Sequence, residues 1–269
     1  MNDVRKVLTI AGSDSGGGAG IQADLKTFQE RNVYGMSAIT ALTAQNTMGV
    51  HGIFPQSLES INQQLDAILS DLGADAVKTG MLFSGDIINT VAIKLRDYHV
   101  TNLVIDPVMI AKGGSTLLEE EAIESLKTEL FPLASLITPN IPEASVLLHG
   151  MIIEKIEDME EAAMKLSRYG CNGVLIKGGH MDGLDSVDVL YANEKLYYFE
   201  SRRIDTKHTH GTGCTFSACI AAELAKGHPI PQAVSLAKDF ITTAIKYSLN
   251  IGHGIGPTNH SAYRMHSKV

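Results

Sequence analysis

Tryptophan is absent from this sequence, and only three cysteines occur among its 269 residues. Cys171, Cys214 and Cys219 lack the spacing of metal ligands, and a reducing compartment would keep this odd number of cysteines as thiols. We expect Cys171 and Cys219, which lie in apolar surroundings, to be small buried side chains. The context of Cys214 is different and is considered below.

Positive charge is also scarce. The 22 Lys and Arg residues are outnumbered by 30 Asp and Glu residues, which gives a net charge of −8. A protein with this charge has no broad electrostatic attraction to nucleic acid or anionic lipid. The stretch MNDVRKVLTIAGSDSG reaches polar and glycine residues after about five apolar ones, too few for a signal peptide or a membrane span. We therefore expect a cytoplasmic protein whose partners include neither nucleic acid nor a membrane.

Linkers and repeats are missing as well. No Pro/Gly/Ser-rich linker, low-complexity tract or internal repeat divides the chain, and 44% of its residues are hydrophobic. Chains of the α/β class with about 200 to 250 residues commonly form one domain. We expect a single domain over residues 1–269.

The chain does contain a regular alternation of short apolar runs and segments with helical periodicity. This alternation predicts an α/β fold with a mostly parallel central sheet and helices on both faces. Between Ser186 and Arg203, two strand-like runs flank an Asn-Glu turn and predict a small antiparallel hairpin at a sheet edge. The runs of strand length are VLTIAG, SAITALTA, AVKTG, LVIDPV, SLITPN and GVLIKGG. The predicted helices span residues 19–31, 58–72, 85–98, 119–130, 156–169, 215–226 and 230–249.

Polar and glycine residues gather where the predicted strands end. Ligands of open parallel sheets bind beyond the carboxyl ends of the strands, so these positions predict an active site. They are Gly12-Ser13-Asp14, Gln45-Asn46, Lys78-Thr79-Gly80-Met81, Asp106-Pro107-Val108, Thr138-Pro139-Asn140 and Lys177-Gly178-Gly179.

Two familiar nucleotide-binding motifs are weak or absent. Residues 18–23 match the dinucleotide fingerprint GxGxxA, but that motif also expects an acidic residue at the end of the second strand, where this chain has Gln45-Asn46. The P-loop pattern GxxxxGK[ST] does not occur. Phosphate binding is therefore expected elsewhere.

A better phosphate site is THGTGCTF, residues 209–216, where small residues lead directly into a helix. Free amides at that helix start would bind an anion. Alternatively, Gly211 and Gly213 only shape a tight loop, and Thr212 or Thr215 caps the helix. At this position the helix dipole would lower the pKa of the Cys214 thiol, so that a thiolate accepts a proton from a substrate hydroxyl. The alternative for Cys214 is a buried thiol that fills space.

A second candidate cluster is acidic. Asn140 and Glu143 follow a strand and open the next helix, and Asp106 ends another strand. Mg²⁺ prefers a few oxygen ligands and retained waters, so these residues are candidates for a metal site beside nucleotide phosphates. The alternative role for Asn140 and Glu143 is a capped helix start.

Several segments together resemble the hydroxymethylpyrimidine and hydroxymethylpyrimidine-phosphate kinases of thiamin synthesis, members of the ribokinase superfamily. The segments are AGSDSGGGAGIQADLKTF, TALTAQNT, KTGML, IDPVM, TPNIPEA, IKGGH and HGTGCTFSA, and the resemblance extends from Lys6 to Ala262. It implies a ribokinase-like sheet with ATP and Mg²⁺ at one end of the groove and the pyrimidine alcohol at the other. It also implies a homodimer, because kinases of this kind are often dimeric.

The resemblance assigns roles to particular residues. Cys214 occupies the position at which many superfamily members carry a catalytic Asp. The anion hole maps to Gly211, Thr212 and Gly213, the nucleotide region to Lys177, Gly178, Gly179, His180 and Asp188, and the metal region to Asp106, Asn140 and Glu143. For Asp188 an exposed strand position is an equal alternative. On the substrate side we expect Gly12, Asp24, Gln45, Met81 and Val108.

Gln45 bears on the choice of substrate. A carboxamide offers an acceptor and a donor in one plane, which match the amino group and ring nitrogen of an aminopyrimidine edge. Pyridoxal lacks this pair, but pyridoxal kinase of vitamin B6 salvage stays open as an alternative. A nicotinamide-dependent oxidoreductase and a catalytically idle ligand sensor are alternatives from other classes.

Overall fold

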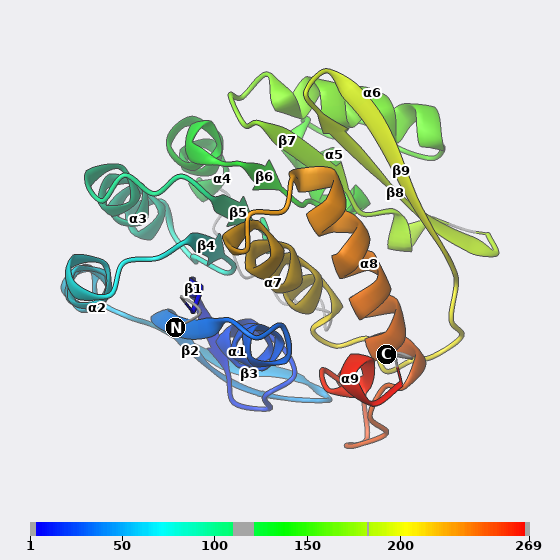
Figure 1. Ribbon diagram of the computed structural model, residues 1–269, viewed down its shortest axis with the longest axis horizontal. Coiled ribbons are helices and arrows are strands. Elements are labelled where there is room, and N and C mark those ends of the chain that lie inside the picture. Colours follow the sequence, from blue (N-terminus) through cyan, green and yellow to red (C-terminus); the bar gives the residue numbers. More distant parts are fainter. Residues whose placement is uncertain (1–3, 110–120, 182, 267–269) are drawn as a thin grey trace.

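The computed structural model describes residues 4–109, 121–181 and 183–266. Within these residues, nine strands form one sheet in the order β3-β2-β1-β4-β5-β6-β7-β8-β9 (Figure 1). The neighbours from β2 to β7 pair in parallel, whereas β3 joins β2, β8 joins β7 and β9 joins β8 in antiparallel pairs. The strands are β1 (Lys6–Asp14), β2 (Tyr34–Asn46), β3 (Gly49–Pro55), β4 (Ala76–Thr79), β5 (Leu103–Ile105), β6 (Leu136–Ile137), β7 (Gly173–Ile176), β8 (Asp185–Ala192) and β9 (Lys195–Arg202).

Helices cover both faces of the sheet (Figure 1). One face carries α2 (Leu58–Asp71), α3 (Gly85–Asp97), α4 (Ala122–Ser125), α5 (Ile141–Leu147) and α6 (Ile156–Ser167). A π-helical turn (Leu126–Leu130) and a 3-10 turn (Phe131–Leu133) continue α4. The other face carries α1 (Gly20–Glu30), α7 (Thr212–Ala225) and α8 (Ile230–Lys246), and α9 (Ala262–His266) packs against α8.

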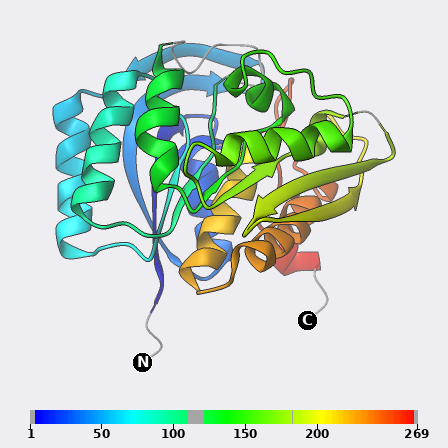
Figure 2. The same cartoon turned by 90° about the horizontal axis from the view of Figure 1, so that it is seen from above.

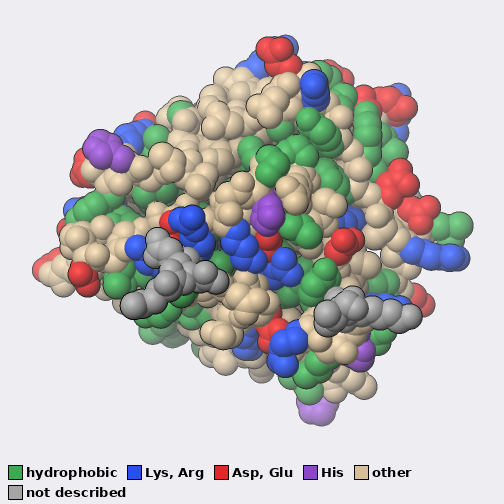
Figure 3. Space-filling view, viewed as in Figure 1, with side chains coloured by type: hydrophobic (Ala, Val, Ile, Leu, Met, Phe, Trp, Pro, Cys, Tyr) green, Lys and Arg blue, Asp and Glu red, His purple; other side chains and the backbone are tan. Residues whose placement is uncertain are grey.

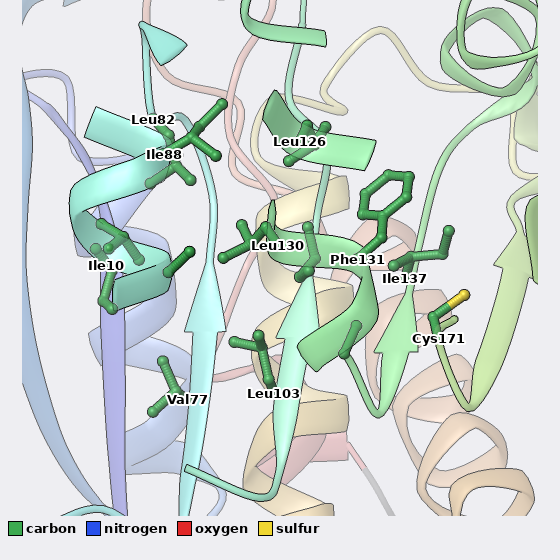
Figure 4. Packing of buried hydrophobic residues seen from close by; sticks show 14 of the residues in the cluster. Ile10, Val77, Leu82, Ile88, Leu103, Leu126, Leu130, Phe131, Ile137 and Cys171 are labelled. Carbon is green, nitrogen blue, oxygen red and sulfur yellow. The ribbon is translucent and has the colours of Figure 1, made fainter. Parts of the chain in front are cut away.

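The two cores follow from the alternation of side chains along each strand. In β5, Leu103 and Ile105 enter the core beneath α3 and α4, whereas Val104 enters the core beneath α7 and α8. Figure 4 shows Leu103 in one layer with Ile88 of α3 and Leu130 of the π-helical turn. Because both faces are buried, the central strands are apolar throughout, as a parallel sheet requires.

The structure confirms the predicted α/β architecture and the hairpin. The hairpin turns at Asn193 and Glu194, whose φ angles of 51° and 59° are typical of the tight turn that suits the twist of β8 and β9. The start of the predicted 119–130 helix lies outside the described residues, and α7 begins at Thr212, three positions before the prediction. Strand β3 was not predicted, because Gly49, Gly52 and Pro55 interrupt its short apolar run and the strand lies half exposed at the edge of the sheet.

The strand direction sets the location of the site. Figure 2 shows β1, in dark blue, beginning on the side where α9 lies in red, so the carboxyl ends of the parallel strands lie at the opposite edge. Acidic and basic side chains occur together on the face shown in Figure 3. Among the described residues, no helix is both long enough and apolar enough to cross a membrane.

Candidate active site

A cavity of about 150 Å³ opens at the carboxyl ends of the parallel strands, beside the start of α7. It brings together most of the residues that the sequence indicated. These are Gly12, Gln45, Met81, Asp106, Val108, Asn140, Glu143, Lys177, Gly211, Thr212, Gly213 and Cys214. Five predicted residues lie outside its walls, namely Asp24, Gly178, Gly179, His180 and Asp188.

The turn into α7 requires glycine. Gly211 has a φ of 80°, and a Cβ at this position would overlap the carbonyl oxygen of Gly18. Gly211 is also the N-cap of α7, and no side chain forms a cap hydrogen bond there. The alternative in which Thr212 or Thr215 caps the helix is therefore wrong: Thr212 Oγ1 donates to Thr209 O, and Thr215 Oγ1 pairs with His260 Nε2. The first residues of α7 line the cavity without a capping side chain, so the amides and dipole of the helix start favour an anion there.

Cys214 lies in the first turn of α7 and lines the cavity. Burial raises the pKa of its thiol to about 11, although the positive charge of Lys78 and a hydrogen bond from the Gly20 amide act in the opposite direction. The sequence-based expectation of a lowered pKa is therefore wrong in sign. Burial is a tertiary effect, which the position of Cys214 at a helix start does not reveal.

A buried ion pair forms the floor of the cavity. Lys78 Nζ lies 2.9 Å from Asp24 Oδ2, both side chains have 0% exposure, and Thr9 Oγ1 donates to the same carboxylate oxygen. Lys78 reaches the cavity wall, whereas Asp24 lies behind it. Asp24 thus neutralises Lys78 and is not placed to touch a molecule in the cavity.

The acidic cluster caps a helix and also borders the cavity. Asn140 Oδ1 accepts from the Glu143 amide and Glu143 Oε2 accepts from the Asn140 amide, so the pair caps α5. Both residues also line the cavity, together with Asp106, whose Oδ1 lies 2.7 Å from Lys177 Nζ. Burial raises the pKa of Glu143 to about 7, while Lys177 opposes that shift. In the described chain no group of three or more His, Cys, Asp or Glu side chains is arranged to hold a metal ion by itself.

The residues expected near the nucleotide divide into two groups. Lys177 faces the cavity, but the 3-10 turn Gly178–His180 lies beyond its walls. Asp188 is 3% exposed, so the alternative of an exposed strand position is wrong. Its carboxylate accepts from the Gly178 amide and from Lys238 Nζ, at 2.9 and 2.7 Å. Asp188 therefore stabilises the 3-10 turn after β7 through its hydrogen bond with the Gly178 amide.

Sequence reasoning missed a second cluster at the mouth of the cavity. Asp14, 3% exposed, ends β1 and accepts from the amides of Gly16, Gly18 and Ala19. His210 Nε2 lies 2.9 Å from Asp14 Oδ2 and 3.4 Å from the amide nitrogen of Gln45. The strand-end position of Asp14 was a usable signal, but its contact with a residue 196 positions away was not visible in the sequence.

Comparison with known proteins agrees with this geometry. A family model described as phosphomethylpyrimidine kinase matches residues 14–259. The chain belongs to this family.

Three relatives illustrate the range of the phosphomethylpyrimidine kinase family and its neighbours. The chain is 55% identical to a hydroxymethylpyrimidine/phosphomethylpyrimidine kinase of Haemophilus influenzae, over 98% of this chain and 99% of the relative. It is 51% identical to the Bacillus subtilis enzyme of the same name, over 98% and 97% of the two chains. The crystal structure of an ADP complex of Bacillus subtilis pyridoxal kinase superposes with a TM-score of 0.91 at 47% identity and covers 98% of this chain and 100% of that one.

These relatives confirm the ribokinase-like fold and the assignment as a small-molecule kinase of thiamin biosynthesis. They also remove the nicotinamide oxidoreductase from consideration, because family membership extends over the GxGxxA loop itself. That loop instead packs its Gly18 against Gly211 and His210. The match to GxGxxA was therefore a coincidence of glycine spacing.

Proposed function

We propose that this chain transfers the γ-phosphoryl group of ATP to the hydroxymethyl oxygen of 4-amino-5-hydroxymethyl-2-methylpyrimidine, and then to the monophosphate so formed. One observation carries this proposal: the uncapped start of α7, the Cys214 thiol and the Gln45 carboxamide line the same cavity. An anion site, a proton acceptor and a group that can read a pyrimidine edge are thereby brought together. We place the enzyme in the cytoplasm, because the sequence carries no signal-peptide pattern, and we propose a homodimer, as the resemblance to thiamin-pathway kinases implies.

The cavity residues supply what phosphoryl transfer needs. The transition state spreads negative charge over the transferred oxygens, and fixed donors stabilise that charge. Gly213 and Cys214, in the first turn of α7, line the cavity, and the Lys177 ammonium lies close to Gly213. The substrate oxygen attacks phosphorus as the bond to the ADP oxygen breaks, and the hydroxyl proton passes to Cys214 in its thiolate form, which becomes the thiol.

The oxygen donors fit Mg²⁺ that arrives with the nucleotide. Asp106, Asn140 and Glu143 present carboxylate and amide oxygens to the cavity, but much of their bonding capacity is used by Lys177 and by the α5 cap. Such a set suits an ion that keeps several waters and is held in part by phosphates. When bound, Mg²⁺ would neutralise phosphate charge at this end of the cavity.

Replacement of Gln45 by alanine tests the substrate assignment. Gln45→Ala is expected to lower kcat/KM for the aminopyrimidine by about 5- to 150-fold, since one buried polar pair is worth about 1–3 kcal/mol. Pyridoxal, which lacks the matching edge, should be affected much less. Steady-state kinetics with both alcohols would measure the two changes. Asn46→Ala, next in sequence but outside the cavity walls, is the matched control. An equal loss for both alcohols, or no loss for either, would remove the pyrimidine-reading role.

Replacement of Glu143 by glutamine tests the metal end of the cavity. Glu143→Gln is expected to lower turnover, most strongly at limiting Mg²⁺, because the carboxylate charge is lost while the amide oxygen can still cap α5. The stability of the variant, relative to wild type, should increase with pH. The pKa of about 7 lies above the ordinary value of 4.5, so the folded wild type loses stability as pH rises from about 4.5 to about 7. The Tm of the variant relative to wild type should therefore rise between about pH 5 and pH 7 and then level off, as thermal unfolding would show. Unchanged kinetics at limiting Mg²⁺ would exclude Glu143 from the site.

A further inference from the structure

The hydrogen-bond network at the mouth of the cavity constrains which substrate edge the site can accept. Four residues take part, and all of them line the cavity: Asp14, Thr43, Gln45 and His210. Asp14 is ionised at neutral pH. Burial opposes its ionisation, but the hydrogen bonds from His210 and from the Gly16 and Ala19 amides hold its pKa below the ordinary value. An ionised carboxylate only accepts hydrogen bonds.

The histidine must therefore donate to Asp14. His210 Nε2 lies 2.9 Å from Asp14 Oδ2, a separation at which a bare ring nitrogen would place its lone pair against the carboxylate. The Nε2 atom thus carries a hydrogen. The backbone of His210 is held on both sides, since its amide donates to Gly256 O and its carbonyl accepts from the Thr258 amide. The donor is fixed in position as well as in protonation.

A fixed donor at His210 decides the orientation of the Gln45 carboxamide. With the amide nitrogen toward His210, two N–H groups would face each other across 3.4 Å. In that orientation Thr43 Oγ1, with one hydrogen, would also have to serve two acceptors, Ser13 O at 3.0 Å and Gln45 Oε1 at 3.2 Å. A half-turn of the carboxamide exchanges oxygen and nitrogen with almost no change of shape. It removes the contact between the two N–H groups, and it leaves Thr43 Oγ1 with Ser13 O as its one acceptor because Gln45 Nε2 then donates to Thr43 Oγ1. The single Nε2 hydrogen of His210 is then shared, with the short branch to Asp14 Oδ2 at 2.9 Å and the long branch to Gln45 Oε1, which takes the position 3.4 Å away.

We propose that Asp14 and His210 fix the Gln45 carboxamide in this single orientation, so that the cavity accepts an aminopyrimidine and rejects the oxopyrimidine with the same ring. This inference rests on the proposed function. The fixed carboxamide offers its oxygen on the His210 side and its N–H on the Thr43 side. An aminopyrimidine matches that order when its amino group lies beside His210. An oxopyrimidine presents the reverse order, a carbonyl acceptor beside a ring N–H donor, and would leave both pairs mismatched.

In this account His210 is a positioning residue that acts through Gln45. Its role differs from a general structural one in a measurable way. If His210 loses its donor, the carboxamide is free to turn and can match the reversed edge. The oxopyrimidine should then become a better substrate, which loss of structure alone would not produce.

The experiment measures ATP-dependent phosphorylation of 4-amino-5-hydroxymethyl-2-methylpyrimidine and of its 4-oxo analogue. The wild type should prefer the amino compound in kcat/KM by at least about 100-fold, since two hydrogen bonds are mismatched in the oxo compound. His210→Leu should reduce this preference by at least about tenfold, mainly through a rise in kcat/KM for the oxo compound. His210→Gln can place an N–H donor near the position of Nε2 and should keep the preference within about threefold of wild type.

A second pair of variants keeps the test decisive if His210→Leu does not fold. Thr43→Val removes the acceptor for the Gln45 amide nitrogen and should also weaken the preference, whereas Thr43→Ser should retain it. A His210→Leu or Thr43→Val enzyme that loses activity on both compounds in proportion, with the preference unchanged, would overturn the inference. Failure of the wild type to phosphorylate the amino compound would instead overturn the proposed function on which the inference rests.

Discussion

A Gly213→Val enzyme is expected to fold and to lose phosphoryl transfer by at least about 100-fold, the scale of removing one fixed donor from an oxyanion site. A Cβ at Gly213 would lie 3.4 Å from Asp106 Oδ2 and 3.5 Å from Lys177 Nζ, which is ordinary van der Waals contact. The two methyl groups of valine would extend further, into the space between the α7 amides and Lys177. That space is where we place the transferred phosphoryl group.

Gly213→Ala is the matched control, because its single methyl group fits the same contacts and should reduce turnover much less. Circular dichroism and thermal unfolding of both variants would separate loss of fold from loss of chemistry. A folded Gly213→Val enzyme with wild-type turnover would show that phosphate does not approach α7 here. Gly211 is unsuitable for this purpose, since its positive φ and its contact with Gly18 make any side chain disruptive.

Removal of the Cys214 sulfur is expected to have a comparable effect. Cys214→Ala should lower kcat by about 100- to 10,000-fold, the range for loss of a positioned general base. With a pKa of about 11, nearly all of the thiol is protonated at pH 7. If the thiolate is the base, wild-type kcat/KM should rise about tenfold per pH unit from pH 8 to pH 10, because the ionised fraction rises by that factor.

The pH profile of Cys214→Ala provides the control for this prediction. Its residual activity should be nearly independent of pH over the same interval. A flat wild-type profile, or near-normal turnover in Cys214→Ala, would leave the thiol with only the space-filling role. Cys171 and Cys219 are 7% and 0% exposed, lie in the apolar cores and should tolerate replacement by alanine without a change in this profile.

The sequence predicted the sheet well because its parallel strands are buried on both faces. Runs such as VLTIAG and GVLIKGG are continuous and apolar, so their type and approximate position could be identified without structural information. Strand β3 has no such signal. Its residues pair with β2 at the edge of the sheet, where two glycines and a proline interrupt the apolar run and the side chains are partly exposed to solvent.

The candidate site could be predicted in outline because parallel strands end at the same edge of a sheet. This rule brought Gln45, Asp106, Asn140 and Lys177 together correctly. The rule does not say which side chains reach the cavity and which are buried behind its wall. Asp24 is buried behind Lys78, and this contact joins positions that are 54 residues apart in the sequence.

Electrostatic properties were the least accessible to sequence reasoning. The position of Cys214 at a helix start suggested a low pKa, whereas enclosure of the thiol by loops from distant parts of the chain raises it. The Asp14 and His210 pair illustrates the same point, because the contact joins the loop after β1 to the loop before α7. Such properties depend on which segments meet, and local sequence carries little information about that.

The most direct test of the proposed function is a comparison of ATP-dependent phosphorylation of hydroxymethylpyrimidine, hydroxymethylpyrimidine monophosphate and pyridoxal by the wild-type protein. Formation of ADP and of each phosphorylated product would be followed under the same conditions with Mg²⁺. We predict that hydroxymethylpyrimidine and its monophosphate are both phosphorylated, and that kcat/KM for hydroxymethylpyrimidine exceeds that for pyridoxal. A higher kcat/KM for pyridoxal, or no ATP-dependent product from either pyrimidine, would contradict the account.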